Sequence, residues 1–177
     1  MSTSLTYYVA ATLDGYIAHD DGTFDGFVWD DELVADMVAS FQTYGTVLMG
    51  RKTYDVGLRE GKTNPYPMLR QVVFSRTMTS PDAAVEVTDQ DPVAFVRALK
   101  AEANEPIWLC GGGSMAAQLM AAGLIDHLQV KVNPVLFGGG IPLFADPIPQ
   151  TDLTLTDTKV YTESGIVLLR YDVQHGS

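Results

Sequence analysis

Hydrophobic residues form short apolar runs in some parts of the chain and recur at helical spacing in others. The runs at 5–11, 46–50, 71–75 and 106–110 have the length and composition of buried strands. In 31–45, 92–103 and 114–122, apolar residues recur every three or four positions, which predicts helices packed on a core, and a short helix is expected directly after Gly50. Strands that alternate with helices in this way predict a mainly parallel sheet covered on both faces.

After residue 122 the pattern changes to that of strands, at 124–132, 152–161 and 166–173. The tetrapeptide Thr162-Glu163-Ser164-Gly165 separates the last two and predicts a hairpin, whereas 134–149 is an excursion rich in Gly and Pro. We therefore expect an α/β protein of one domain, residues 1–177. Its three α/β/α layers would contain a mainly parallel central sheet with an antiparallel C-terminal hairpin.

Composition and charge narrow the function classes. The 177 residues are 46% hydrophobic and 19% charged, as in a folded domain, and the formal net charge of −11 opposes binding to nucleic acid. A phosphate-bearing small molecule needs only a few well-placed cations. The only cysteine, Cys110, excludes an intrachain disulfide, and there is neither a secretory signal pattern nor an apolar run of membrane-spanning length, so we expect a cytoplasmic protein without membrane contact. The three histidines are isolated in sequence, and no metal site is predicted.

Two strand-to-helix crossings carry the strongest chemical signal, VLMGRKT at 47–53 and IWLCGGGSM at 107–115. Open parallel sheets bind ligands at the carboxyl ends of their strands, where both crossings would lie. The glycines at 111–113 would let a pyrophosphate approach the backbone and the first N–H groups of the next helix. Arg51, Lys52 and Arg76 would supply positive charge for an additional 2′-phosphate. A glycine turn that only packs a helix on a strand, and cations that are simply solvated, are the alternatives.

Several motifs resemble those of a known superfamily. The order of MGRKT, Ser75-Arg76, IWLCGGG and a terminal hairpin resembles dihydrofolate reductase. The segments ATLDGYIA at 11–18 and NPVLFGGG at 133–140 resemble the reductase domain of riboflavin biosynthesis, the RibD C-terminal family. This resemblance implies an NADPH-dependent reductase that is often dimeric. The nearest reaction it suggests is reduction of 5-amino-6-(5-phosphoribosylamino)uracil, with a heterocyclic or sugar-derived C=N or C=O group as the general substrate. A dihydrofolate or pterin reductase and a non-catalytic nucleotide-binding protein are the alternatives.

The resemblance also implies cofactor-binding residues in four segments of the chain. These are Ala10, Ala11 and Ile17 beside the nicotinamide; Gly50, Arg51, Lys52 and Thr53 at the first crossing; Ser75 and Arg76 at the adenosine and 2′-phosphate; and Gly111, Gly112, Gly113, Ser114 and Met115 at the pyrophosphate. The segment from Leu124 to Gly140 resembles the dimer-forming region of the family, so we expect a homodimer.

The substrate end is less well matched. Dihydrofolate reductases carry a carboxylate inside the first helix, and the spacing of that family falls on Val34 here. Asp31, one turn earlier, is therefore the candidate catalytic acid only if the helix is offset, and Trp29 and Asp30 are candidate substrate contacts. A partner of the helix dipole, for the acids, and a core residue, for Trp29, are the alternative roles.

Cys110 occupies the position where riboflavin reductases often place a glutamate, just before the glycine turn. A lone cysteine at the end of a strand is usually a small buried hydrophobic residue, so no catalytic role is assigned to it. The substrate pocket is expected to differ from those of both groups.

Overall fold

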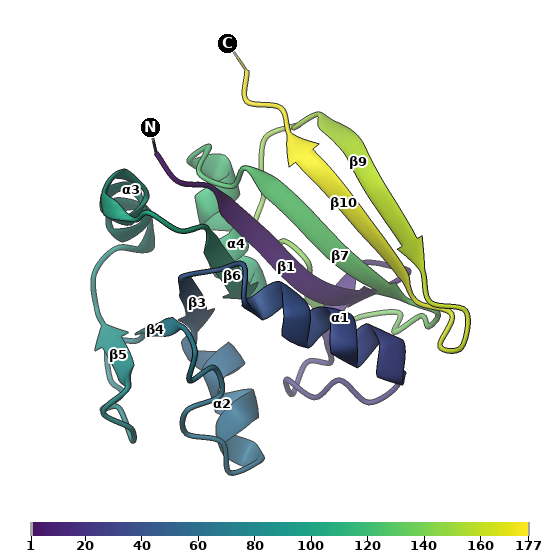
Figure 1. Ribbon diagram of the computed structural model, residues 1–177, viewed down its shortest axis with the longest axis horizontal. Helices are drawn as coiled ribbons and strands as arrows, with labels where there is room; N and C mark the ends of the chain where they lie inside the picture. Colours follow the sequence, from purple (N-terminus) through teal and green to yellow (C-terminus); the bar gives the residue numbers. More distant parts are fainter. Residues whose placement is uncertain (1, 177) are drawn as a thin grey trace.

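The computed structural model describes residues 2–176 and is built around an eight-stranded sheet (Figure 1). The strand order is β5-β4-β3-β6-β1-β7-β10-β9. The strands are β1 (Leu5–Thr12), β3 (Thr46–Gly50), β4 (Arg70–Phe74), β5 (Val85–Thr88), β6 (Ile107–Gly111), β7 (His127–Asn133), β9 (Leu153–Val160) and β10 (Val167–Val173). The six strands from β5 to β7 pair in parallel, and β9 and β10 form the predicted antiparallel hairpin. The predicted α/β fold class is confirmed.

Four helices cover the two faces of this sheet. Helices α1 (Asp31–Phe41) and α2 (Arg51–Arg59) contribute Leu33 and Tyr54 to one buried cluster, which also contains Trp108 of β6. Helices α3 (Pro92–Glu102) and α4 (Gly113–Ala121) pack on the opposite face in a second cluster around Tyr7. Figure 1 shows α1 crossing in front of β1, with α4 behind the sheet. Successive side chains of a strand point to opposite faces, so the sheet contributes to both clusters. The sheet and the helices on its two faces are the three layers.

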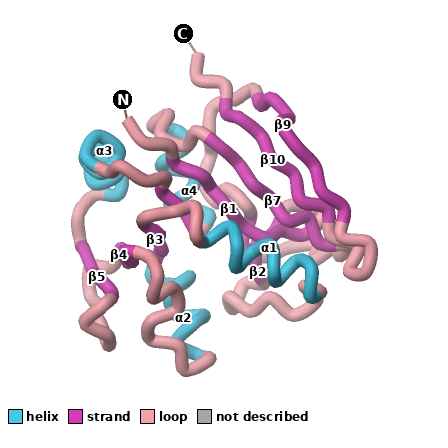
Figure 2. Tube along the Cα trace, in the orientation of Figure 1, coloured by secondary structure: helices cyan, strands magenta, loops and turns pink. Residues whose placement is uncertain are grey.

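A small second sheet lies beside the first. It pairs β2 (Tyr16–Ala18) with β8 (Ile141–Pro142), and in Figure 2 the loops around β2 lie beneath α1. The Gly- and Pro-rich excursion therefore folds back on the segment after β1. Gly113 at the start of α4 permits this approach, because a Cβ there would collide with the carbonyl oxygen of Pro142.

Two boundaries differ by three or more residues from those predicted, and three short strands were not predicted. Helix α1 ends at Phe41 rather than near Gly45, because a turn follows and Gly45 packs directly against Glu105. Strand β7 begins at His127, three residues later than predicted. Strands β2, β5 and β8 were not predicted, since two to four residues carry too little periodicity and only their pairing partners make them strands.

No helix among the described residues combines the length and apolar character needed to cross a membrane.

Candidate active site

A cleft of about 1160 Å³ opens at the carboxyl ends of the parallel strands. One end is formed by the two strand-to-helix crossings, and the other reaches the sheet face beneath α1. The β2–β8 ribbon contributes Ile17, Ile141 and Pro142 to its wall. The register explains this convergence, because Gly50 of β3 lies opposite Phe74 of β4, and Met49 lies opposite Gly111 of β6.

The glycine turn brings the two crossings into backbone contact. A Cβ on Gly50 would lie 3.4 Å from the amide nitrogen of Gly112, and a Cβ on Gly111 would lie 3.1 Å from Thr53 Oγ1. Gly111 also has a φ of +151°, a conformation that favours glycine, and the Gly111–Gly112 peptide is cis. The absence of side chains leaves the backbone of this turn open to a ligand in the cleft.

Both helices that leave these crossings lack a side-chain cap. Gly50 is the N-cap of α2 and Gly112 is the N-cap of α4, and neither can supply an oxygen to the first N–H groups. The positive ends of the two helix dipoles therefore converge on one part of the cleft. Such an arrangement suits an anionic group such as a pyrophosphate.

The predicted cations and hydroxyls differ in where they lie. Lys52 and Thr53 line the cleft, as does Arg51, whose Nε also donates a 2.8 Å hydrogen bond to Asp55 within α2. Ser114 lines it too, with its hydroxyl donating to Asp146 at 2.8 Å.

Ser75 and Arg76 follow β4 at the same sheet edge but are not among the residues that line the cleft. Ser75 Oγ instead accepts hydrogen bonds from the amides of Thr77 and Met78, which shapes the loop after β4. The side chain of Arg76 is exposed.

Of the residues predicted beside a nicotinamide, Ile17 lines the cleft, as does Val9 of β1. Ala11 is buried in the sheet, and Ala10 borders a smaller cavity beneath Trp29. Met115, like all three residues of the glycine turn, lines the main cleft.

The structure separates the three candidates at the substrate end. Trp29 lines the cleft with its side chain half exposed, so it is a rim residue and not a core tryptophan. Asp30 is instead the N-cap of α1: its carboxylate accepts from the amides of Leu33 at 2.7 Å and Ser164 at 3.2 Å. The hydrogen bonds from Ser164 and Leu33 hold the pKa of Asp30 below its usual value. Asp31 is exposed in the first turn of α1, away from the cleft lining, where it interacts favourably with the helix dipole.

Sequence reasoning missed most of the residues beneath α1. Met37, Phe41 and Tyr66 line this end of the cleft together with Cys110. Phe41 and Tyr66 meet edge to face at 5.4 Å, which gives the pocket rigid aromatic walls. The helical spacing marked Met37 and Phe41 only as core positions, and nothing in the sequence distinguishes a core position from one that borders a cavity.

The polar groups in these walls are neutral near pH 7. Burial raises the pKa of the Cys110 thiol to about 11, and its Sγ lies 3.8 Å from the Tyr66 hydroxyl. The neighbouring Cys110 and burial raise the pKa of Tyr66 well above its usual value. A protonated thiol is a poor nucleophile, which agrees with a non-catalytic Cys110.

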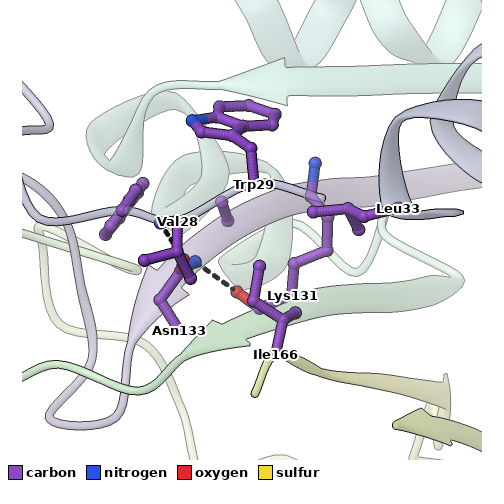
Figure 3. A pocket seen from close by; sticks show the side chains of 8 residues that line it. Val28, Trp29, Leu33, Lys131, Asn133 and Ile166 are labelled. Atoms are coloured by element: carbon purple, nitrogen blue, oxygen red, sulfur yellow. Dashed lines mark hydrogen bonds between the residues drawn. The ribbon is translucent and has the colours of Figure 1, made fainter. Parts of the chain in front are cut away.

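A buried lysine lies at the floor of the same region. Lys131 of β7 borders the smaller cavity together with Trp29, Leu33 and Asn133, and Figure 3 shows its side chain extending from β7 toward the side on which Trp29 lies. Burial lowers the pKa of Lys131 to about 8. Its position in a strand of alternating polarity gave no sign of this environment.

Asn133 ties the rim of the pocket to the sheet. Its side-chain oxygen accepts a 3.0 Å hydrogen bond from the amide of Val28, and its amide group donates to the carbonyl of Lys131 at 3.3 Å (Figure 3). The residue is 1% exposed, so these bonds are shielded from water.

The chain is similar in sequence to two bacterial proteins. The chain is 32% identical over 169 residues to the uncharacterised protein YwjB of Bacillus subtilis, covering 93% of this chain and 95% of that protein. It is 25% identical to the riboflavin biosynthesis protein RibD of Corynebacterium ammoniagenes over 83% of this chain but only 48% of that longer protein.

Solved structures show the same fold. A putative riboflavin biosynthesis protein from Shewanella sp. PV-4 superposes with a TM-score of 0.83 at 25% identity, covering 99% of this chain and all of that one. The dihydrofolate reductase of Enterococcus faecalis, solved in complex with NADP(H), superposes at 0.71 and 18% identity over 99% and 100% of the two chains, which shows a shared fold. The model of the RibD C-terminal domain matches residues 3–168, and the chain belongs to that family.

Proposed function

We propose that the protein is an NADPH-dependent reductase that acts on a C=N or C=O group of a heterocyclic or sugar-derived substrate. The observation that carries this proposal is the convergence of two uncapped helix N-termini on a glycine-walled part of the cleft, beside Arg51 and Lys52. Such a site offers backbone donors to a pyrophosphate and side-chain cations to a 2′-phosphate. The fold shared with reductases supports the same assignment.

The residues of this chain would bind and orient the two reactants. The first N–H groups of α2 and α4 would hold the pyrophosphate, and Lys52 with Arg51 would meet the 2′-phosphate. Ile17 and Val9 also line the cleft, and in this proposal they would flank the nicotinamide. NADPH, when bound, supplies the hydride, and the protein contributes position and exclusion of water.

The substrate would occupy the end of the cleft beneath α1. Trp29, Phe41 and Tyr66 give this end three aromatic walls, which suit a planar ring. A solved structure from Thermotoga maritima, of which this chain covers 57%, is of a diaminohydroxyphosphoribosylaminopyrimidine deaminase and 5-amino-6-(5-phosphoribosylamino)uracil reductase, and the pyrimidine of the second activity is the first substrate to test. The two sequences are 17% identical, so that pyrimidine is a test compound chosen by analogy, and the aromatic walls support only a planar ring.

Calorimetric titration with NADPH and NADH tests the cofactor assignment. We expect NADPH to bind more tightly, since charge-assisted hydrogen bonds to the 2′-phosphate contribute roughly 1.5–3 kcal/mol each. Equal affinities would overturn the assignment. Nicotinamide absorbance then reports turnover of the phosphoribosylaminouracil, dihydrofolate and simple carbonyl compounds. Turnover of dihydrofolate alone would identify a pterin reductase, and cofactor binding without any turnover would identify a non-catalytic nucleotide-binding protein.

A further inference from the structure

Lys131 is a buried cation without an oxygen partner. Lys131 is 7% exposed. Its Nζ lies 3.3 Å from the thioether sulfur of Met37 and 4.7 Å from the ring centre of Tyr8. Within residues 2–176, no carboxylate lies within ion-pair distance of this ammonium. A thioether is a weak acceptor, so the three donor hydrogens of Lys131 are poorly satisfied.

The second buried lysine shows how such a group is normally accommodated. Lys100 is also 7% exposed, but its Nζ donates to the carbonyl of Leu124 at 2.9 Å and forms an ion pair with Asp126. A buried charge ordinarily needs such partners, because its desolvation is costly. Lys131 therefore lacks the carbonyl and carboxylate acceptors that Lys100 has.

The position of Lys131 shows where that acceptor would come from. Met37, which contacts the ammonium, lines the main cleft, and Trp29 borders both this cleft and the smaller cavity that holds Lys131. The ammonium thus lies at the base of the aromatic pocket beneath α1. In Figure 3 it ends between Trp29 and Leu33.

The chemistry of this pocket selects one kind of ligand group. An ammonium only donates hydrogen bonds, so it recognises a carbonyl or anionic oxygen and not an amino group. The only carboxylate that lines the cleft within the described chain is Glu60, which follows α2 and pairs with Lys62. The end beneath α1 thus has a strong donor and no carboxylate acceptor.

We propose that Lys131 recognises the substrate: its ammonium donates a hydrogen bond to a carbonyl or anionic oxygen on a planar ring held between Trp29 and the aromatic walls of the pocket. This inference about Lys131 rests on the proposed function, which assigns the end of the cleft beneath α1 to the substrate. The lowered pKa of Lys131 has the same origin, since burial without an acceptor disfavours the charged form. A bound oxygen would supply the missing partner and strengthen the charged state.

Uracil and 1,3-diaminobenzene form the pair of planar probes, because uracil carries two carbonyl oxygens that accept hydrogen bonds, whereas 1,3-diaminobenzene carries two amino groups on a ring without nitrogen acceptors. Protein carrying 13C,15N-labelled lysine has five lysine signals, and that of Lys131 is identified by its loss in K131M. We expect millimolar uracil, with or without NADP⁺, to shift the Lys131 signal and 1,3-diaminobenzene to leave it unchanged. In K131M the affinity for uracil should fall roughly tenfold or more, as expected for loss of a charged hydrogen bond.

K159M is the control, because it also removes one cation. Lys159 is paired with Glu32 and Asp36 of α1 and is not among the residues that line the cleft. Its affinity for uracil should match that of the wild type. An unshifted Lys131 signal, or equal affinities of K131M and wild type for uracil, would overturn the inference. NADPH affinity on the same samples decides the proposed function separately, because loss of cofactor binding would leave the uracil result intact.

Discussion

The backbone amide of Val28 donates a 3.0 Å hydrogen bond to Oδ1 of Asn133, across 105 positions of sequence. The adjacent residue is Trp29, so this bond fixes the rim of the aromatic pocket to the end of β7. The hydrogen bonds of the Asn133 side chain go to Val28, Ala11 and Lys131, which lie outside the glycine turn. The bond therefore orients the substrate end of the cleft without touching the cofactor end.

We expect Asn133→Ala to weaken substrate binding but not NADPH binding. The change leaves the Val28 amide without its partner, at a cost of about 1–3 kcal/mol in the free energy of unfolding. Denaturant unfolding and two calorimetric titrations measure both effects. Gln174→Ala, which removes an exposed hydrogen bond to Thr154, is the control and should change the free energy of unfolding by less than about 0.5 kcal/mol. Equal losses of substrate and NADPH affinity in Asn133→Ala would contradict this role.

Lys131→Met should stabilise the fold at pH 7. The pKa of Lys131 is lowered from 10.5 to about 8 in the folded protein, so the unfolded state binds more protons between these values and wild-type stability rises with pH there. The stabilising effect of the substitution is therefore largest below about pH 8, where it is of the order of 1–3 kcal/mol, and shrinks toward pH 10.5.

Urea unfolding of wild type and Lys131→Met at pH 7 and pH 10 measures this difference. Tyr8 and Cys110 are the titratable groups that face the ammonium from β1 and β6, and burial raises the pKa of both. They therefore contribute little charge at pH 7. A variant less stable than wild type at pH 7 would show that Lys131 has a stabilising partner.

Substitutions at the adjacent residues Gly112 and Gly113 are expected to have different effects, one on NADPH affinity and the other on stability. Gly112 has a φ of −102°, and an added Cβ would meet only Thr53 Oγ1 at 3.6 Å, an ordinary contact. Gly112→Ala should thus lower NADPH affinity, because the methyl group projects where the pyrophosphate is proposed to bind. Gly113→Ala should instead lower the melting temperature, since its Cβ would collide with the Pro142 carbonyl, at about 1–3 kcal/mol.

Calorimetry and thermal unfolding of both variants test this pair. If Gly112→Ala bound NADPH as tightly as the wild type, the glycine turn would be a packing device and the cofactor would have to bind elsewhere.

Asp55 is expected to restrain cofactor selectivity. Its carboxylate accepts a 2.8 Å hydrogen bond from Arg51 in an exposed i,i+4 pair, which neutralises one of the cations proposed to meet the 2′-phosphate. Asp55→Asn should raise the ratio of NADPH to NADH affinity several-fold, whereas Arg51→Gln should lower it about tenfold. The effect should fade at high salt because the pair is exposed. An unchanged ratio in both variants would place the 2′-phosphate away from Arg51.

We also propose that the protein is a homodimer. Leu13 and Leu136 are 70% and 67% exposed on neighbouring segments, joined by a hydrogen bond from the Leu13 amide to the Val135 carbonyl. Exposed apolar side chains of this size, gathered in one place, suit an interface between copies. Light scattering at micromolar concentration should give twice the monomer mass, and Leu136→Asp should reduce it to the monomer value. A monomeric wild type would refute the proposal.

The sequence by itself determined the layers of the fold and the place where the two strand-to-helix crossings meet. The apolar runs of β3 and β6 are buried on both faces and continuous, so their positions could be read without a partner, and their ends fix where Gly50 and the glycine turn meet. The N-cap of α3 also follows from local rules, since Asp91 stands before Pro92 and its carboxylate accepts from the amide of Ala94 three residues on. Such features are predictable because they depend on residues close in sequence or on the periodic spacing of apolar residues.

Only the tertiary structure decided which residues surround the end of the cleft beneath α1. Asp30 caps α1 through the nearby Leu33 amide, but its second carboxylate oxygen accepts from the amide of Ser164, which is 134 positions away. Lys131 is buried because β1 pairs with β7, with Ala10 opposite Lys131, and because Met37 of α1 packs over its ammonium. Burial and unmatched hydrogen bonds arise from elements brought together by folding, and no local pattern encodes the absence of a partner.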